Sequence, residues 1–78
     1  MKARHLKAIQ KAVKYAETKH PVFPNDPVKA CAVLAEEAGE AIREANHIDE
    51  GRNRHDEMMH EVLQSIAVGI RILDNFDC

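Results

Sequence analysis

A chain of 78 residues with a net charge of −2 is long enough for one domain and too short for two. Its composition is 45% hydrophobic and only 4% aromatic, which is typical of helices that pack through small aliphatic side chains. The two cysteines, Cys31 and Cys78, are too few for a disulfide framework. The N-terminal residues lack the apolar core of a signal peptide and no run of 18 apolar residues occurs, so we expect a cytoplasmic protein that does not enter a membrane.

Charge is distributed unevenly along the chain. Residues 1–30 contain seven Lys or Arg and two acids, whereas residues 31–78 contain four Arg and eleven acids. Lys7, Lys11 and Lys14 recur at helical spacing, either as a solvated face that balances the acidic helices or as a positive surface for a polyphosphate. The acidic total and the lack of aromatic residues between these lysines argue against binding to a nucleic-acid polymer.

The first predicted helix covers about residues 3–19, where Leu6, Ile9 and Val13 recur every three or four positions. It ends in a connection over residues 20–27 that contains all three prolines of the chain. Because this connection has no apolar periodicity, it separates the first helix from the second.

The second predicted helix begins where Asp26 precedes Pro27, a pair typical of a helix N-cap followed by the first helical residue. It is expected to reach about Asn46, before a loop over residues 49–53. One side of this helix is expected to be buried, and its residues are Cys31, Leu34, Ala35, Ala38, Ala41, Ile42 and Ala45.

The third predicted helix runs from a cap at Asn53 to about Phe76. It has a broad apolar face, and the residues of this face are Met58, Met59, Val62, Leu63, Ile66, Gly69, Ile70 and Leu73. Its opposite side changes along the helix from polar to apolar, in the order Glu57, His60, Glu61, Gln64, Val68 and Ile72. A helix with apolar residues on both sides is expected to contact protein on both, one side within the subunit and one across a dimer interface.

Carboxylates concentrate on the second predicted helix. Glu36, Glu37 and Glu40 fall within roughly a quarter of the helix circumference and one turn of its length. Such carboxylates repel one another and raise one another's pKa, a cost that a divalent cation would remove. Glu61 and Gln64, three positions apart on the third helix, offer further oxygen atoms. Since Mg²⁺ prefers oxygen ligands, the sequence predicts a Mg²⁺ site between the two helices, with Mn²⁺ as an alternative.

The two motifs Glu36-Glu37-x-x-Glu40 and Glu61-x-x-Gln64 resemble the Glu-Glu-x-x-Glu and Glu-x-x-Asp signature of the MazG-like all-α nucleoside triphosphate pyrophosphatases. The resemblance covers roughly residues 20–73. It implies an all-α, three-helix subunit, a single domain over residues 1–78, that assembles as a homodimer or dimer of dimers into a helical bundle. It also implies Mg²⁺-dependent hydrolysis of a nucleoside triphosphate to a monophosphate and pyrophosphate, as house-cleaning of the nucleotide pool.

Position by position, the resemblance implies that Glu37, Glu40 and Glu61 bind the metal, and that Glu36 and Glu37 orient or deprotonate the attacking water. Gln64 departs from the family pattern, which has Asp there. Its amide oxygen can still ligate a metal, but it lacks the charge that would compensate a second Mg²⁺.

Contacts to the phosphates or the nucleotide are expected from residues that flank the acidic motifs. The candidates are Lys29, Arg52, Arg54 and Asn25. Phe23 either stacks on a base or packs against the core.

Two other functions remain open from the sequence. Gln64 is compatible with a non-catalytic helical oligomerisation or regulatory module that has this fold. Glu57-x-x-His60 is a ligand pattern of di-metal carboxylate bundles, and the histidine would favour a transition metal there.

Overall fold

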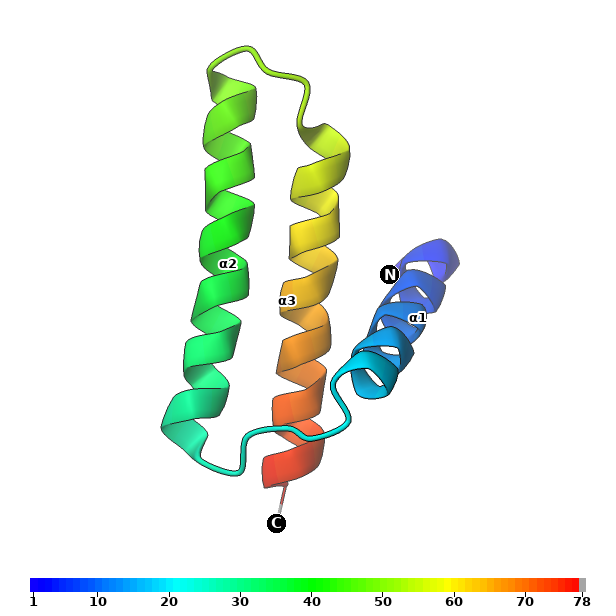
Figure 1. The fold of residues 1–78 in the computed structure, drawn as a ribbon. Helices are drawn as coiled ribbons and strands as arrows, with labels where there is room; N and C mark the ends of the chain where they lie inside the picture. Colours follow the sequence, from blue (N-terminus) through cyan, green and yellow to red (C-terminus); the bar gives the residue numbers. More distant parts are fainter. Residues whose placement is uncertain (78) are drawn as a thin grey trace.

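The structure, a computed structural model, describes residues 1–77 as three α-helices: α1 (Ala3–Lys19), α2 (Pro27–Asp49) and α3 (His55–Phe76). α2 and α3 run antiparallel side by side, and within residues 1–77 α1 packs on α3 alone (Figure 1). No strand occurs in this part of the chain, which confirms the all-α class and the three predicted helices. None of these helices is both long enough and apolar enough to cross a membrane.

The predicted limits of α1 and the predicted start of α2 are confirmed. The backbone N–H of Val28 donates to Oδ1 of Asp26 at 2.9 Å, so Asp26 is the N-cap, and Pro27 is the first residue of the helix. This cap satisfies one of the free N–H groups at the start of the helix, and the fixed φ of Pro27 suits the first position.

α2 ends at Asp49 rather than at the predicted Asn46. The cause is Gly51, whose φ of 89° is in the left-handed region that glycine adopts without strain. The N–H of Gly51 donates to the carbonyl of Ile48, and the N–H of Arg52 donates to the carbonyl of His47, both at 2.9 Å. This pair of bonds is a Schellman motif, which places the last helical residue two positions before the glycine.

The predicted cap of α3 at Asn53 is wrong, because the N-cap residue is Arg54 and its side chain makes no capping bond. That side chain instead reaches Glu44 on α2, with Nη2 donating to Oε2 at 2.6 Å and Nε to the same oxygen at 3.2 Å. His47 Nδ1 lies 3.0 Å from the other oxygen of Glu44, which is only 3% exposed. Arg54 lowers the pKa of Glu44, and Glu44 raises the pKa of Arg54. This ion pair joins α2 to the start of α3.

α1 is attached to α3 by Arg71, whose side chain is only 7% exposed. Nη2 donates to the carbonyl of His20 at 2.7 Å, and Nη1 donates to that of Ala16 at 3.3 Å. These carbonyls belong to the C-terminal end of α1, where a cation is electrostatically favoured. The guanidinium also lies 4.7 Å from the ring centroid of Phe23. Phe23 therefore packs on α3 through Arg71.

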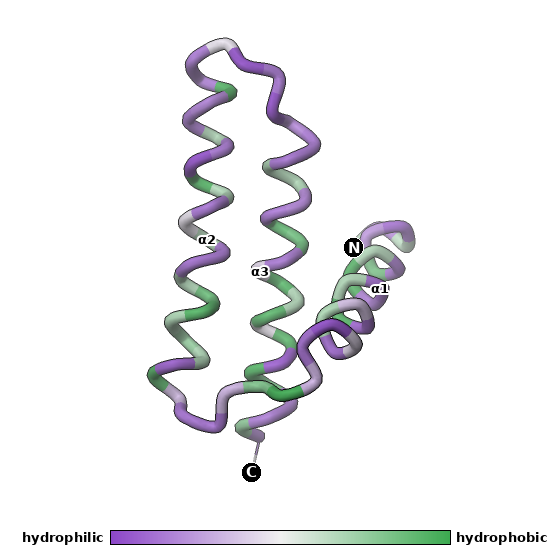
Figure 2. Tube along the Cα trace, viewed as in Figure 1, coloured by the Kyte–Doolittle hydropathy of each residue, from purple (hydrophilic) through white to green (hydrophobic). Residues whose placement is uncertain are grey.

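The interior is thin. In residues 1–77 the fully buried apolar residues are Ala30 and Ala67, and no large side chain is fully buried. The face that α2 turns toward α3 includes Ala30, Glu37 and Glu44, at intervals of seven. Hydrophobic residues also occur on the side of α2 that faces away from α3 (Figure 2).

The predicted burial of one side of α2 is therefore wrong within the single chain. Leu34 and Ala41 are half-buried, but the other predicted residues are exposed. The reason is that the acidic face, rather than the alanine face, packs against α3. The exposed apolar residues recur every three or four positions and form what we name the outer stripe of α2: Val28, Cys31, Ala35, Ala38, Ile42 and Ala45. The thiol of Cys31 is free, and Cys78 lies outside the described residues.

Candidate metal centre

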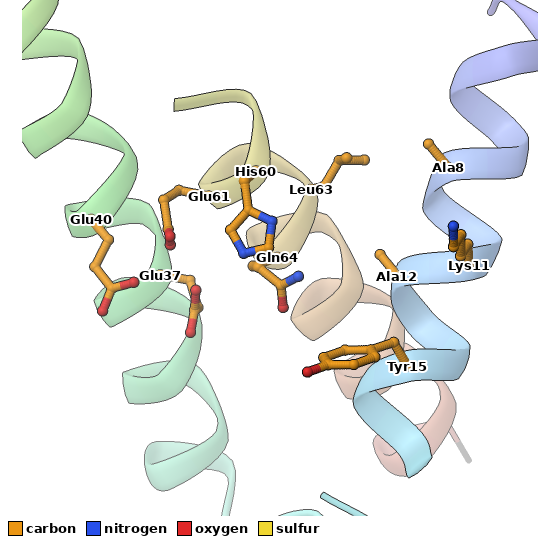
Figure 3. A pocket seen from close by; sticks show the side chains of 10 residues that line it. All are labelled: Ala8, Lys11, Ala12, Tyr15, Glu37, Glu40, His60, Glu61, Leu63 and Gln64. Carbon is orange, nitrogen blue, oxygen red and sulfur yellow. The ribbon is translucent and has the colours of Figure 1, made fainter. Parts of the chain in front are cut away.

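Glu37, Glu40 and Glu61 converge between α2 and α3. One carboxylate oxygen from each can be chosen so that all three lie within 4.8 Å of one another, and all three residues are half-buried. Glu37 and Glu40 are three positions apart on the inner face of α2, and Glu61 lies opposite them on α3 (Figure 3). We name these residues the glutamate cluster. It is the one group of three or more acidic, histidine or cysteine side chains in residues 1–77 with this spacing.

The negative charge of the glutamate cluster is only partly offset within residues 1–77, by Arg43 acting on Glu40 and His60 acting on Glu37, and the pKa of both glutamates remains raised. Burial raises the pKa of Glu37, and the neighbouring charge of Glu40 raises it further. A hydrogen bond with Glu61 raises the pKa of Glu40, followed by the charge of Glu61. Oε2 of Glu61 is buried and accepts no hydrogen bond in this part of the chain. A proton or a cation is needed to relieve such a group.

The donor atoms suit a hard divalent cation. All three are carboxylate oxygens, the ligand type of Mg²⁺, Mn²⁺ and Ca²⁺. Three carboxylates leave other positions of an octahedral Mg²⁺ for water or for phosphate oxygens. The buried Oε2 atom of Glu61 would gain a partner that no group within residues 1–77 provides.

A groove of about 520 Å³ adjoins the glutamate cluster. It opens between α1 and the α2–α3 pair, because α1 packs on α3 and does not pack on α2. Its lining residues come from all three helices: Ala8, Lys11, Ala12, Tyr15, Glu37, Glu40, His60, Glu61, Leu63 and Gln64 (Figure 3). Acidic groups of α2 and α3 thus share one cavity with a lysine and a tyrosine of α1.

The other residues of the predicted acidic motifs are placed differently. Gln64 lines the groove beside the glutamate cluster, as does His60. Glu36 is exposed and does not line the groove, although its charge contributes to the raised pKa of Glu37. Glu57 of the alternative Glu57-x-x-His60 pattern lies 3.7 Å from Arg54 Nη1.

The four residues predicted to contact phosphates or the nucleotide lie outside the groove. Asn25, Lys29 and Arg52 are exposed, in the Pro-rich connection, at the start of α2 and in the second loop respectively. Arg54 is bonded to Glu44. Arg54 nevertheless lines a second cavity, of about 330 Å³, together with Glu61 of the cluster, whereas Asn25, Lys29 and Arg52 line neither cavity.

The basic and aromatic residues of the groove come from α1 instead. The sequence did not distinguish Lys11 from Lys7 and Lys14 as a ligand-binding residue. It gave no signal for Tyr15 either, apart from its position one helical turn after Lys11. Only the packing of α1 on α3 places them in the groove, and the hydrogen bonds of Arg71 contribute to that packing at the C-terminal end of α1.

Comparison of the chain with protein-family models, with curated proteins and with solved structures found no match.

Proposed function

We propose that this protein is a Mg²⁺-dependent nucleoside triphosphate pyrophosphohydrolase of the MazG-like type that removes unwanted nucleotides in the cytoplasm. The glutamate cluster is the observation that carries the proposal. It joins carboxylates of both motifs, Glu36-Glu37-x-x-Glu40 and Glu61-x-x-Gln64, at the side of a groove large enough for a small-molecule ligand. The resemblance to the family supplies the reaction.

Glu37, Glu40 and Glu61 are the proposed metal ligands, and Gln64 is a neutral ligand beside them. Bound Mg²⁺ would neutralise charge on the phosphate oxygens and make a bound water more acidic. Mn²⁺ offers the same coordination geometry and is the natural substitute.

The proposed reaction is attack of water on the α-phosphorus. A bond forms between the water oxygen and this phosphorus, the bond from the phosphorus to the α–β bridging oxygen breaks, and pyrophosphate leaves with that oxygen. Glu37 is the better placed of the two predicted catalytic glutamates to accept the proton of the water, because it lines the groove and Glu36 does not.

A homodimer or dimer of dimers is part of the proposal. Both helices of the α2–α3 pair expose apolar residues: Val28 is 77% exposed and Ile42 63% on α2, and Leu73 is 67% exposed on α3. Contiguous exposed apolar surface is characteristic of a protein interface. A second copy that covers it would supply the core that a 78-residue chain lacks.

Pyrophosphate release from a panel of nucleoside and deoxynucleoside triphosphates, with Mg²⁺ and with EDTA, tests the proposal. We expect metal-dependent release by the wild-type protein and its loss in Glu61→Gln. Glu50→Gln is the matched control, since Glu50 is exposed at the end of α2, away from the groove. Metal-independent release, or release that survives Glu61→Gln, would contradict the proposed site.

A second candidate is a non-catalytic oligomerisation module. The exposed outer stripe of α2 favours it, as does Gln64 in place of the acid of the family pattern. A protein of this kind would form the oligomer but release no pyrophosphate from any nucleotide of the panel.

A further inference from the structure

The wall of the groove opposite the glutamate cluster belongs to α1. Lys11 and Tyr15 are four residues apart, so they lie on the same side of this helix, and both line the groove (Figure 3). Neither residue belongs to the acidic motifs. The groove is therefore acidic on one side and basic and aromatic on the other.

Lys11 shares the groove with three carboxylates but makes no ion pair within residues 1–77. Opposite charges that line one cavity without contact leave space for a ligand that interacts with both. A metal-bound polyphosphate has this property, because some of its oxygens bind the cation while others remain free for an ammonium group.

Tyr15 provides an apolar surface on the same wall. Its side chain is exposed and extends from α1 into the groove (Figure 3). Lys19 Nζ lies 5.9 Å from the centroid of its ring, near the outer limit of a cation–π contact. Ala8, Ala12 and Leu63 add small apolar side chains to the lining. A planar base can pack on such a surface, as bases do on aromatic side chains in other proteins.

We propose that α1 is the substrate-binding wall of the groove, with Lys11 binding the β- and γ-phosphates through Nζ and Tyr15 packing on the base. This inference rests on the proposed function for the identity of the ligand. It assigns binding to α1 and metal coordination to α2 and α3, so the position of α1 on α3 determines whether the groove can hold a nucleotide.

Calorimetric binding in Mg²⁺ tests this assignment without turnover. The probes are tripolyphosphate, which has no base, and a nucleoside triphosphate with a methylene group in place of the α–β bridging oxygen, which cannot release pyrophosphate. Lys11→Ala should weaken binding of both probes about 10-fold or more, as expected when a charged hydrogen-bond donor is lost. Lys7→Ala removes the same charge one turn away, outside the groove, and should change binding less than about 2-fold by long-range electrostatics.

The two probes distinguish the role of Tyr15 from that of Lys11. Tyr15→Leu should weaken the nucleotide probe about 5-fold or more through loss of base stacking and leave tripolyphosphate binding unchanged. Tyr15→Phe should retain binding of both. Alanine and leucine are good helix formers, so these variants should retain the helices. Unchanged circular dichroism and unchanged oligomer size will confirm that each variant is folded.

Failure of this inference differs from failure of the proposed function. Equal effects of Lys11→Ala and Lys7→Ala, or equal effects of Tyr15→Leu on both probes, would overturn the role of α1 even where pyrophosphate release is robust. Absence of binding of both probes to the wild type would also overturn it. Binding that depends on Lys11 and Tyr15 in a protein without turnover would support the α1 wall and contradict hydrolysis.

Discussion

Two glutamates on the inner face of α2, one turn apart, have pKa shifts of opposite direction because their neighbours differ. Glu44 meets Arg54, and its pKa is lowered. Glu40 meets Glu61, and its pKa is raised. Arg54 pairs with Glu44 and not with Glu40, so negative charge remains concentrated beside the groove, where Arg43 offsets only part of it. The proposed metal site uses this concentration of negative charge.

Glu40→Gln should raise the melting temperature in EDTA, because it removes repulsion from the glutamate cluster, and should reduce the stabilisation by Mg²⁺. Mg²⁺ at about 100 times its dissociation constant would add about 2.7 kcal/mol to the wild type by mass action. This corresponds to an increase of roughly 10 °C or more for a domain of this size. Differential scanning calorimetry with and without Mg²⁺ measures both effects.

Glu36→Gln is the control, since Glu36 has the same charge but lies outside the cluster. It should retain most of the increase in melting temperature that Mg²⁺ causes.

The pH dependence of stability supplies an independent check. The raised pKa values of Glu37 and Glu40 mean that the metal-free protein loses stability as the pH rises above 4.5, the ordinary value, through the raised values. The shift caused by Mg²⁺ should grow over the same interval, and a constant shift would contradict the cluster as the binding site.

Gln64→Asp should increase pyrophosphate release and tighten metal binding, because it adds a charged ligand beside the glutamate cluster. A gain of about 1.4 kcal/mol in transition-state stabilisation corresponds to roughly 10-fold in rate. The same change adds repulsion without metal, so the variant should melt at a lower temperature than the wild type in EDTA. Release and melting are measured across a series of Mg²⁺ concentrations. If pyrophosphate release and the melting temperature of Gln64→Asp equal those of the wild type, Gln64 does not contact the metal.

Helix positions were largely predictable from the sequence, while the orientation of the helices was not. The limits of α1 and the cap of α2 follow from local chemistry, namely apolar periodicity and the pair Asp26-Pro27. The burial of the alanine-rich side of α2 was predicted wrongly for the single chain, because such a face is as suitable for a second copy as for the same chain. The three cluster glutamates were chosen from their motifs, whereas Lys11 and Tyr15 required the packing of α1.

Arg71→Met should release α1 from α3. Methionine preserves much of the apolar stem but removes the bonds to the carbonyls of Ala16 and His20 and the contact with Phe23. The lost charged hydrogen bonds are worth about 2 kcal/mol or more. Hydrogen exchange resolved along the sequence should show faster exchange in α1, with little change in α2.

Arg52→Met is the matched control, since Arg52 is exposed in the loop between α2 and α3. Its exchange pattern should equal that of the wild type. Uniformly faster exchange over all three helices of Arg71→Met would indicate that α1 does not open as a separate unit. In that case Arg71 stabilises the whole domain rather than the attachment of one helix.

The whole molecule is too open to be explained by its own interior. Its radius of gyration is 13.5 Å, against about 11.5 Å for a compact domain of this length. α1 projects from one side of α3, and α2 covers another (Figure 1). Within residues 1–77 the fully buried apolar residues are alanines, so this part of the single chain gains little from the hydrophobic effect. The proposed association with a second copy would supply further burial.

Ile42→Glu tests whether the outer stripe of α2 forms the interface between copies. Ile42 is 63% exposed in the single chain, so a charge there costs little unless another subunit covers it. In a dimer that buries the outer stripe, the unpaired carboxylate would be desolvated, and association should weaken at least about 10-fold.

Lys29→Glu is the control, because Lys29 is exposed on the same helix but lies outside the stripe. Light scattering and sedimentation at micromolar concentration should therefore show an oligomer for the wild type and the control, and dissociation with loss of helicity for Ile42→Glu. A fully helical wild-type monomer of 8.8 kDa would contradict the dimer, and an unchanged oligomer in Ile42→Glu would place its interface elsewhere, with the exposed apolar residues of α3 as the next surface to test.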